Sequence, residues 1–260
     1  MAMAGAPRQY LAINAAALAA GLGWIAIGRL PQSVILQRSL ALVLLALLFV
    51  PLVTGPTQTA IGGAQVTRWI PLGPITVNAG LLALPAILVL AVRDEAYAPP
   101  ILFTALLAAS LQPDGALGFA ITFAAVGLHH VTRDWKLGLV AIIGFFAAIV
   151  ASLEGELPPA RFVEHVFRDA GQTSVLAALA LAVCLAAAFF AILYRAPLAR
   201  AERYAVAGAL FGFTIASLMN SYPTPLLGYG AAPVIGFGLA LGLGRGKVKD
   251  NAAADAAALD

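Results

Sequence analysis

The chain has 260 residues, of which 62% are hydrophobic and only 10% charged, and its formal net charge is +3. A soluble domain carries roughly 25% charged residues, and a soluble protein of this size has too little interior for so much apolar surface. The composition therefore excludes a soluble domain and predicts an all-α, polytopic integral membrane protein. The charge forms no basic patch, so we expect no nucleic-acid partner.

Charged residues fall in clusters, and the stretches between the clusters are apolar. A helix needs about 20 apolar residues to cross a hydrocarbon core about 30 Å thick. Hydropathy and the positions of Pro and Gly predict about nine transmembrane helices, the first without a clean signal-peptide cleavage site. The predicted spans are 10–28, 39–54, 76–92, 98–112, 115–131, 137–153, 173–194, 204–220 and 229–244.

The basic residues predict the orientation. With nine spans and a cytoplasmic C-terminus, 11 of the 15 Lys and Arg residues lie on the cytoplasmic side and 4 on the outer side. This asymmetry follows the positive-inside rule, so we expect the N-terminus outside. The short segments 98–112 and 115–131 form either a tight hairpin or a re-entrant pair, and merging them into one span would weaken the asymmetry. We expect residues 1–245 to form one transmembrane domain and 246–260 a disordered cytoplasmic tail.

The outer loop 154–172 carries a candidate acid–base group. Arg161, Glu164 and Arg168 recur at spacings of three and four, which would place them on one face of an amphipathic helix. One interpretation is a solvated face with ion pairs worth about 0.3–0.5 kcal/mol each. The other is a carboxylate held between two guanidinium groups at the membrane surface, able to act as a base or bind a cation. In both cases we expect Glu164 to be surface-accessible.

Other polar residues beside the spans have structural interpretations. Asp114 lies in a Pro-Asp-Gly turn, although an acid between two spans needs the surface or a partner. His129 and His130 end a predicted span and point about 100° apart, so we do not expect them to bind one metal ion. The single cysteine, Cys184, lies in an apolar run, where we expect a small buried hydrophobe.

Motifs of soluble catalysis are missing from the sequence. It contains no nucleotide-binding glycine loop, HExxH, CxxC or serine-nucleophile elbow, so we expect neither a cofactor nor a metal ion. The Pro/Gly-rich segment 223–233 leads into the last span. This segment is either a tightly packed helix start or the wall of a binding cavity.

Three short segments resemble, in order, motifs of the SEDS proteins (shape, elongation, division and sporulation). These are the RodA/FtsW-type polytopic glycosyltransferases, which polymerise lipid II into peptidoglycan. Residues 68–74, RWIPLGP, are similar to the family motif RWIxLGP. Residues 112–114, QPD, resemble the start of QPDLGT, although the following residues differ. Residues 225–230, PLLGYG, resemble PFLSYGG before the final span.

A fourth segment, residues 159–167, is similar to the family's PEAHTDFIF and places Glu164 where the family has its catalytic aspartate. The resemblance covers about 64–244. It implies a SEDS-like helical bundle in the bacterial inner membrane, with a periplasmic N-terminus and one span fewer than the usual ten. It also implies contact with a lipid-linked glycan precursor. The candidate substrate-binding residues are Arg68, Trp69, Asp114, Arg161, Arg168 and Tyr229.

The sequence departs from the family at several polar positions. After the first motif the family has QPSExxK, whereas residues 77–83 here are VNAGLLA, so both charged positions are apolar. Ala83 stands where a cation would pair with a pyrophosphate. Phe162 and Val163 stand where the family motif has His and Thr.

These departures favour a non-polymerising binding or scaffold component of cell-envelope assembly or of a larger membrane complex. Its expected partners are membrane lipid and other membrane proteins, contacted through helix faces. The alternative is an active glycosyltransferase on a lipid-linked glycan, with Glu164 as general base. A small transporter or channel is disfavoured because no charged residue lies mid-span.

Overall fold

The computed structural model describes residues 6–29, 31–73, 75–160 and 162–244. The predicted tail 246–260 and the candidate Arg161 therefore lie outside the described residues. Eleven helices and four short strands occur in the described part. They are α1 (Arg8–Ile27), α2 (Val34–Phe49), α3 (Pro51–Thr54), β1 (Gln58–Thr59), β2 (Gln65–Val66), β3 (Trp69–Leu72), β4 (Ile75–Asn78), α4 (Ala79–Arg93), α5 (Ala98–Leu111), α6 (Gly115–Thr132), α7 (Trp135–Glu154), α8 (Val166–Thr173), α9 (Val175–Arg195), α10 (Arg200–Met219) and α11 (Ala231–Leu243).

Each predicted span coincides with one of these helices, or with α2 and α3 together. Five segments are long and apolar enough to cross a membrane: α1, α2 with α3, α6, α7 and α9. The apolar helices α4, α5 and α11 are shorter, and α10 has 20 residues with charges in its first turn. The chain is thus a multi-pass α-helical membrane protein. Helices α5 and α6 are separate, joined by a three-residue turn, as in the hairpin alternative.

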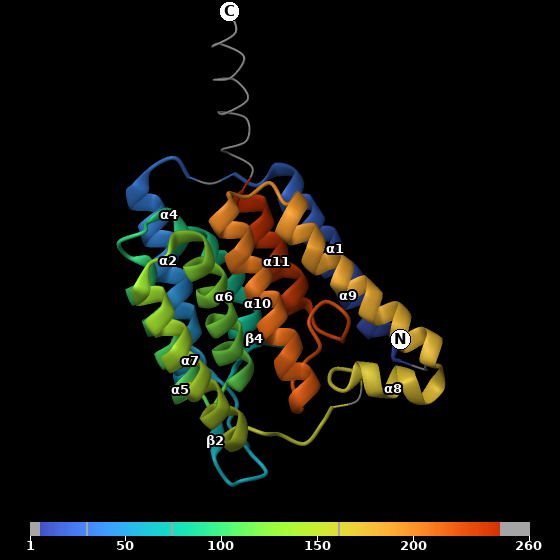
Figure 1. Cartoon of the computed structure of the whole chain (residues 1–260). Coiled ribbons are helices and arrows are strands. Elements are labelled where there is room, and N and C mark those ends of the chain that lie inside the picture. The colour runs from blue at the N-terminus through green and yellow to red at the C-terminus, as the bar shows by residue number, and fades with distance from the viewer. Residues whose placement is uncertain (1–5, 30, 74, 161, 245–260) are drawn as a thin grey trace, which may run out of the picture.

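Helices α4, α6 and α10 form the packed centre of the bundle (Figure 1). Helix α4 is buried over most of its length because α2, α5, α6, α10 and α11 pack around it. Helices α6 and α10 lie very close together at two glycines. A Cβ atom at Gly208 or Gly212 would lie 2.3 or 2.4 Å from a carbonyl oxygen of α6. By contrast, α1 and α9 bury few residues and lie at the edge of the molecule.

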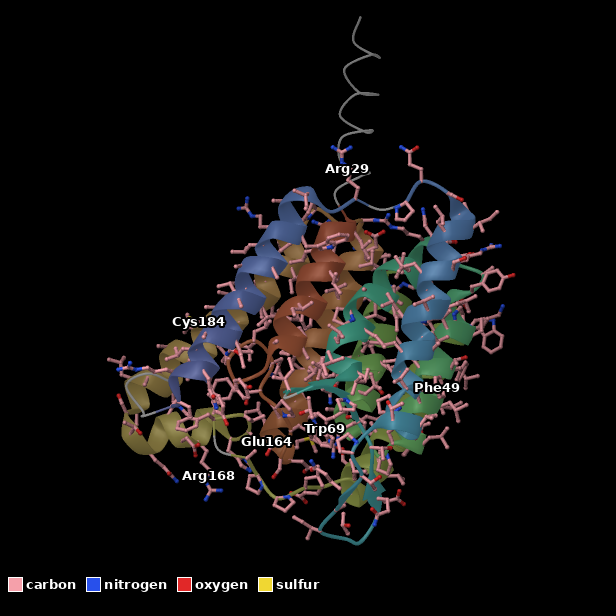
Figure 2. All side chains as sticks on the ribbon, turned by 180° about the vertical axis from the view of Figure 1, so that it is seen from behind. Arg29, Phe49, Trp69, Glu164, Arg168 and Cys184 are labelled. Carbon is pink, nitrogen blue, oxygen red and sulfur yellow. The ribbon has the colours of Figure 1, made fainter. Side chains whose placement is uncertain are left out.

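The two ends of the bundle differ in what they carry. Arg29 lies at one end, and Trp69, Glu164 and Arg168 lie towards the other, which we call the loop end (Figure 2). The loop end contains two antiparallel hairpins, β1–β2 and β3–β4, of which the second pairs Trp69 with Asn78. The loop end also carries α8. The hairpins and α8, which surround the candidate site, therefore lie at the same end of the bundle.

The structure corrects three local expectations. The loop 55–75 contains strands, which the all-α class did not predict. Helix α8 begins only at Val166, because His165 before it has a left-handed φ of 54°. Glu164 therefore precedes the helix and does not share a helix face with Arg168. Finally, Cys184 is exposed rather than buried, because the first half of α9 stands at the edge of the bundle.

Candidate functional site

Arg68 is a buried guanidinium at the loop end, only 1% exposed. Its Nη2 donates a hydrogen bond to the carbonyl oxygen of Gly155, and its Nη1 lies 3.9 Å from Oδ1 of Asp114. The rings of Trp69 and Tyr222 lie 5.1 and 4.6 Å from the guanidinium carbon, within cation–π distance. Its Nε has no hydrogen-bond partner in the described chain. We call Arg68 and these four neighbours the arginine anchor.

Asp114 links the anchor to the start of α6. Its side chain accepts a hydrogen bond of 3.1 Å from the backbone N–H of Leu117, which makes it the N-cap of the helix. The N–H of the next residue, Gly115, donates to the hydroxyl of Tyr222 at 2.8 Å. Asp114 is 2% exposed and faces Arg68. The guanidinium is thus the charged partner that a buried acid between two spans needs.

Glu164 lies in the segment between α7 and α8, outside the membrane-spanning helices. It is 7% exposed, so the expectation of surface accessibility is wrong: the loop folds back, and the backbone N–H of Ala160 donates to Oε2 at 2.7 Å. Burial raises the pKa of Glu164 to about 7, although the Ala160 hydrogen bond and the positive charge of Arg68 act to lower it. A carboxyl group with a pKa near neutrality suits general-base chemistry.

Glu164 faces a cleft of about 1270 Å³ between residues 159–160 and 162–165, α8 and the first half of α9. The polar wall of this cleft includes Glu164, His165 and Arg168. The Nε2 atom of His165 lies 3.2 Å from the hydroxyl oxygen of Ser221, which ties this wall to the loop after α10. Among the described residues, the wall therefore offers hydrogen-bonding groups, the carboxyl group of Glu164 with its raised pKa, a second carboxyl group at Asp169 and the guanidinium of Arg168.

The opposite wall of the cleft is apolar. It is formed by one face of α9, which contributes Ala177, Ala180, Leu181 and Cys184. Helix α9 has no buried residue before Leu185, because its first half stands apart from the bundle. Figure 1 shows α9 along the edge of the molecule with α8 lying across its start, and in Figure 2 Cys184 lies further from the loop end than Glu164. The cleft thus runs from polar loops into the membrane-spanning zone.

The structure separates the predicted site residues into three groups. The described members are Arg68, Trp69 and Asp114 in the arginine anchor, Glu164 and Arg168 in the cleft, and Tyr229 in the loop after α10. The first two groups are neighbours, because the charge of Arg68 acts on Glu164. Tyr229 stacks on Tyr10 of α1, with ring centroids 3.7 Å apart.

Two neighbours of the site, Tyr222 and Asn14, do not follow from the sequence patterns. Tyr222 is 1% exposed and completes the arginine anchor, but no motif distinguishes it from other loop aromatics. The side-chain amide of Asn14 donates through its nitrogen to the loop after α10 and accepts through its oxygen from the same loop. The position of Asn14 inside an apolar span is a signal for such a contact, because a side-chain amide there needs a hydrogen-bond partner.

Comparisons with known proteins give a fold but no close sequence relative. A scan against protein-family models finds no match, and a search of curated proteins finds none. Rod shape determining protein RodA of Thermus thermophilus matches with 20% identity and a TM-score of 0.56, over 93% of this chain and 89% of RodA. A chain from a peptidoglycan synthase complex that coordinates polymerization and crosslinking matches with 22% identity and a TM-score of 0.60, over 91% of this chain and 89% of that chain.

The fold and the site together define a multi-pass α-helical membrane protein with a cleft at one end of the bundle. More particularly, its fold is that of RodA, since both alignments span almost the whole chain. The SEDS-like helical bundle that the sequence motifs predict is thereby confirmed as a fold.

The arginine anchor predicts a strong dependence of stability on Arg68. The substitution Arg68→Met leaves Asp114 buried without its cation and should lower the free energy of unfolding by about 3–5 kcal/mol. Thermal melting of the purified protein in detergent measures this loss. The matched control is Arg38→Met, because Arg38 pairs with Asp94 at an exposed site and its removal should leave the melting temperature unchanged. Equal melting temperatures for the two variants would contradict the role of the anchor.

Glu164 predicts a pH-dependent stability. Its pKa of about 7 in the folded protein lies above its ordinary value of 4.5, so the protonated form favours the folded state. The resulting stabilisation is complete below about pH 4.5 and is lost as the pH rises through about 7. Between these values the melting temperature of the wild type should fall more steeply than that of Glu164→Gln. The exposed Glu154→Gln is the control, and a slope in Glu164→Gln equal to that of the wild type would refute the assignment.

Proposed function

We propose that this chain is a non-polymerising, RodA-like membrane protein that binds a lipid-linked glycan precursor of peptidoglycan in its cleft. The observation that carries the proposal is the pairing of a polar wall at Glu164 with an apolar wall along α9. A ligand with a sugar head and a hydrocarbon tail needs these two surfaces side by side. The names of the similar structures, rod shape determination and peptidoglycan synthesis, support this class of ligand.

Two features favour binding without polymerisation. The guanidinium of Arg68 is occupied by Asp114 and Gly155, so it does not reach into the cleft to hold a phosphate. Ala83, which stands where the SEDS motif has a cation, is fully buried in α4. Among the described residues of the cleft, Arg168 is the single guanidinium, and it lies on the exposed side of α8.

We also propose that the loop end faces the periplasm and that other membrane proteins contact the helix faces. The orientation rests on the excess of Lys and Arg on the opposite side. Helix α7 exposes Ile142, Phe146 and Val150 beside a groove of about 480 Å³ that Ser110 of α5 also lines. The similarity to a chain of a multi-protein synthase complex supports a helix-packing partner.

A second candidate function is an active glycosyltransferase. The observation that favours it is the pKa of Glu164, raised to about 7 in a group that faces the cleft. Such a carboxylate would take a proton from the acceptor hydroxyl during sugar transfer. This chemistry requires a site for the pyrophosphate leaving group, for which the described cleft offers Arg168 alone among guanidinium groups.

Filling the apolar wall tests the proposed function. Leu181→Trp should weaken binding of lipid II to the purified protein about tenfold, which corresponds to ~1.4 kcal/mol, because the indole occupies the space of the lipid tail. Leu179→Trp is the matched control, since Leu179 is 58% exposed on the same helix. Binding is measured by native mass spectrometry, and glycan polymer is assayed in the same samples.

Each outcome separates the candidates. Weaker binding in Leu181→Trp alone, without glycan polymer from the wild type, supports a binding protein. Glycan polymer made by the wild type and lost in Glu164→Gln supports the glycosyltransferase instead. No binding by the wild type, or equal binding by both tryptophan variants, contradicts the proposed function.

A further inference from the structure

Helix α1 holds the loop after α10 through two side chains. The Nδ2 of Asn14 donates to the carbonyl oxygen of Gly228, and its Oδ1 accepts from the N–H of Gly230, both at 3.1 Å. Between these two residues, the ring of Tyr229 stacks on Tyr10 at 3.7 Å with planes 9° apart. Three consecutive residues of one loop are therefore held by one face of α1. We call residues 223–230 the clasp loop.

The clasp loop in turn holds the segment that carries Glu164. The N–H of Tyr229 donates to the carbonyl oxygen of Phe162 at 2.7 Å, and the N–H of Thr224 donates to that of Val163 at 3.1 Å. Tyr10 also meets the ring of Phe162 edge-on, with centroids 6.5 Å apart. Phe162 lines the cleft, so a continuous set of contacts runs from α1 to the polar wall.

The paired segments need these contacts because their backbones are strained. Phe162 and His165 have φ values of 69° and 54°, and Leu226 in the clasp loop has a φ of 64°. Residues other than glycine rarely adopt this left-handed backbone conformation, and it persists only where neighbouring contacts impose it. Gly228 adds a requirement of its own, since a Cβ atom there would lie 2.6 Å from the carbonyl oxygen of Val163.

Helix α1 is packed along one face only, where Nε1 of Trp24 donates a hydrogen bond to the carbonyl oxygen of Leu239 at 3.2 Å. Its buried residues are Ala17 and Gly21, and it packs mainly on α11, where Gly21 approaches Gly238. In Figure 2 its N-terminal end lies towards the loop end, at the level of α8. Because α1 lies at the edge of the bundle and packs mainly on α11, a shift of α1 leaves the packing of α4, α6 and α10 in place.

We propose that α1 is a strap that sets the width of the cleft, with Asn14 and Tyr10 as positioning residues. While both hold the clasp loop, the Glu164 segment is fixed against the bundle and the cleft is narrow. When α1 moves away, the strained segments relax and the cleft widens towards α9. A role for this movement in controlling lipid access rests on the proposed function. The movement itself does not depend on it.

The chain provides its own probe for this movement. Cys184 is the single cysteine, is exposed and lies in the apolar wall of the cleft. The rate at which N-ethylmaleimide modifies its thiol in detergent-solubilised protein therefore measures how open the cleft is. Because no lipid ligand is added, the rate does not depend on whether the precursor binds.

The decisive variant is Asn14→Leu, which removes both hydrogen bonds at similar side-chain volume. We expect its Cys184 modification rate to rise by about fivefold or more, the change expected when hydrogen bonds of ordinary strength are lost from an opening equilibrium. Tyr10→Leu, which removes the ring stack and keeps Asn14, should raise the rate in the same direction. The matched control is Leu22→Ala, because Leu22 is 56% exposed on the same helix and should leave the rate unchanged.

The outcomes test the strap role of α1 separately from the proposed function. Faster modification in Asn14→Leu or Tyr10→Leu, at a native gel-filtration profile, supports the strap. Unchanged rates in both folded variants overturn it, and so does unfolding of both, because α1 would then be an ordinary structural helix. A faster rate in a protein that binds no lipid II would leave the strap standing and the proposed function refuted.

Discussion

The structure of the loop end depends on one constraint, the full burial of a guanidinium in a mostly apolar protein. Removing an ion from water costs several kcal/mol unless charge and hydrogen-bond partners replace the solvent. For Arg68 the partners are Asp114, the carbonyl oxygen of Gly155 and the ring of Tyr222. They come from the α5–α6 turn, the end of α7 and the loop after α10. A single charge therefore fixes the relative positions of the segments that surround Glu164.

The same constraint limits what the site can do. Arg68 is paired within the protein, so its positive charge acts on Glu164 while its side chain is not among the described residues that line the cleft. The described residues of the cleft offer the buried carboxyl group of Glu164, the exposed side chains of Arg168 and Asp169, and a long apolar wall on α9. This combination is richer in apolar surface than in phosphate-binding groups, and it is the reason we propose a binding function.

The sequence predicts the helices well and the loop end poorly, for a physical reason. Apolar stretches between charges specify spans, because the bilayer leaves the backbone no alternative to a helix. Loop geometry depends instead on contacts distant in sequence. The spacing predicts that Glu164 lies on a helix face, but the left-handed backbone of His165 delays the helix, and the N–H of Ala160 donates to the carboxyl group. Cys184 was expected to be buried, and no local pattern shows that α9 stands off the bundle.

The most direct test of the account is a map of where a lipid-linked precursor touches the protein. Lipid II with a photoreactive group in its hydrocarbon tail would be crosslinked to the purified wild type and the modified peptides sequenced. If the cleft holds the lipid tail, crosslinks should form on α9 around Ala180, Leu181 and Cys184, which line the apolar wall. Crosslinks confined to other membrane-facing surfaces, such as the groove at Ile142 and Phe146, would contradict it.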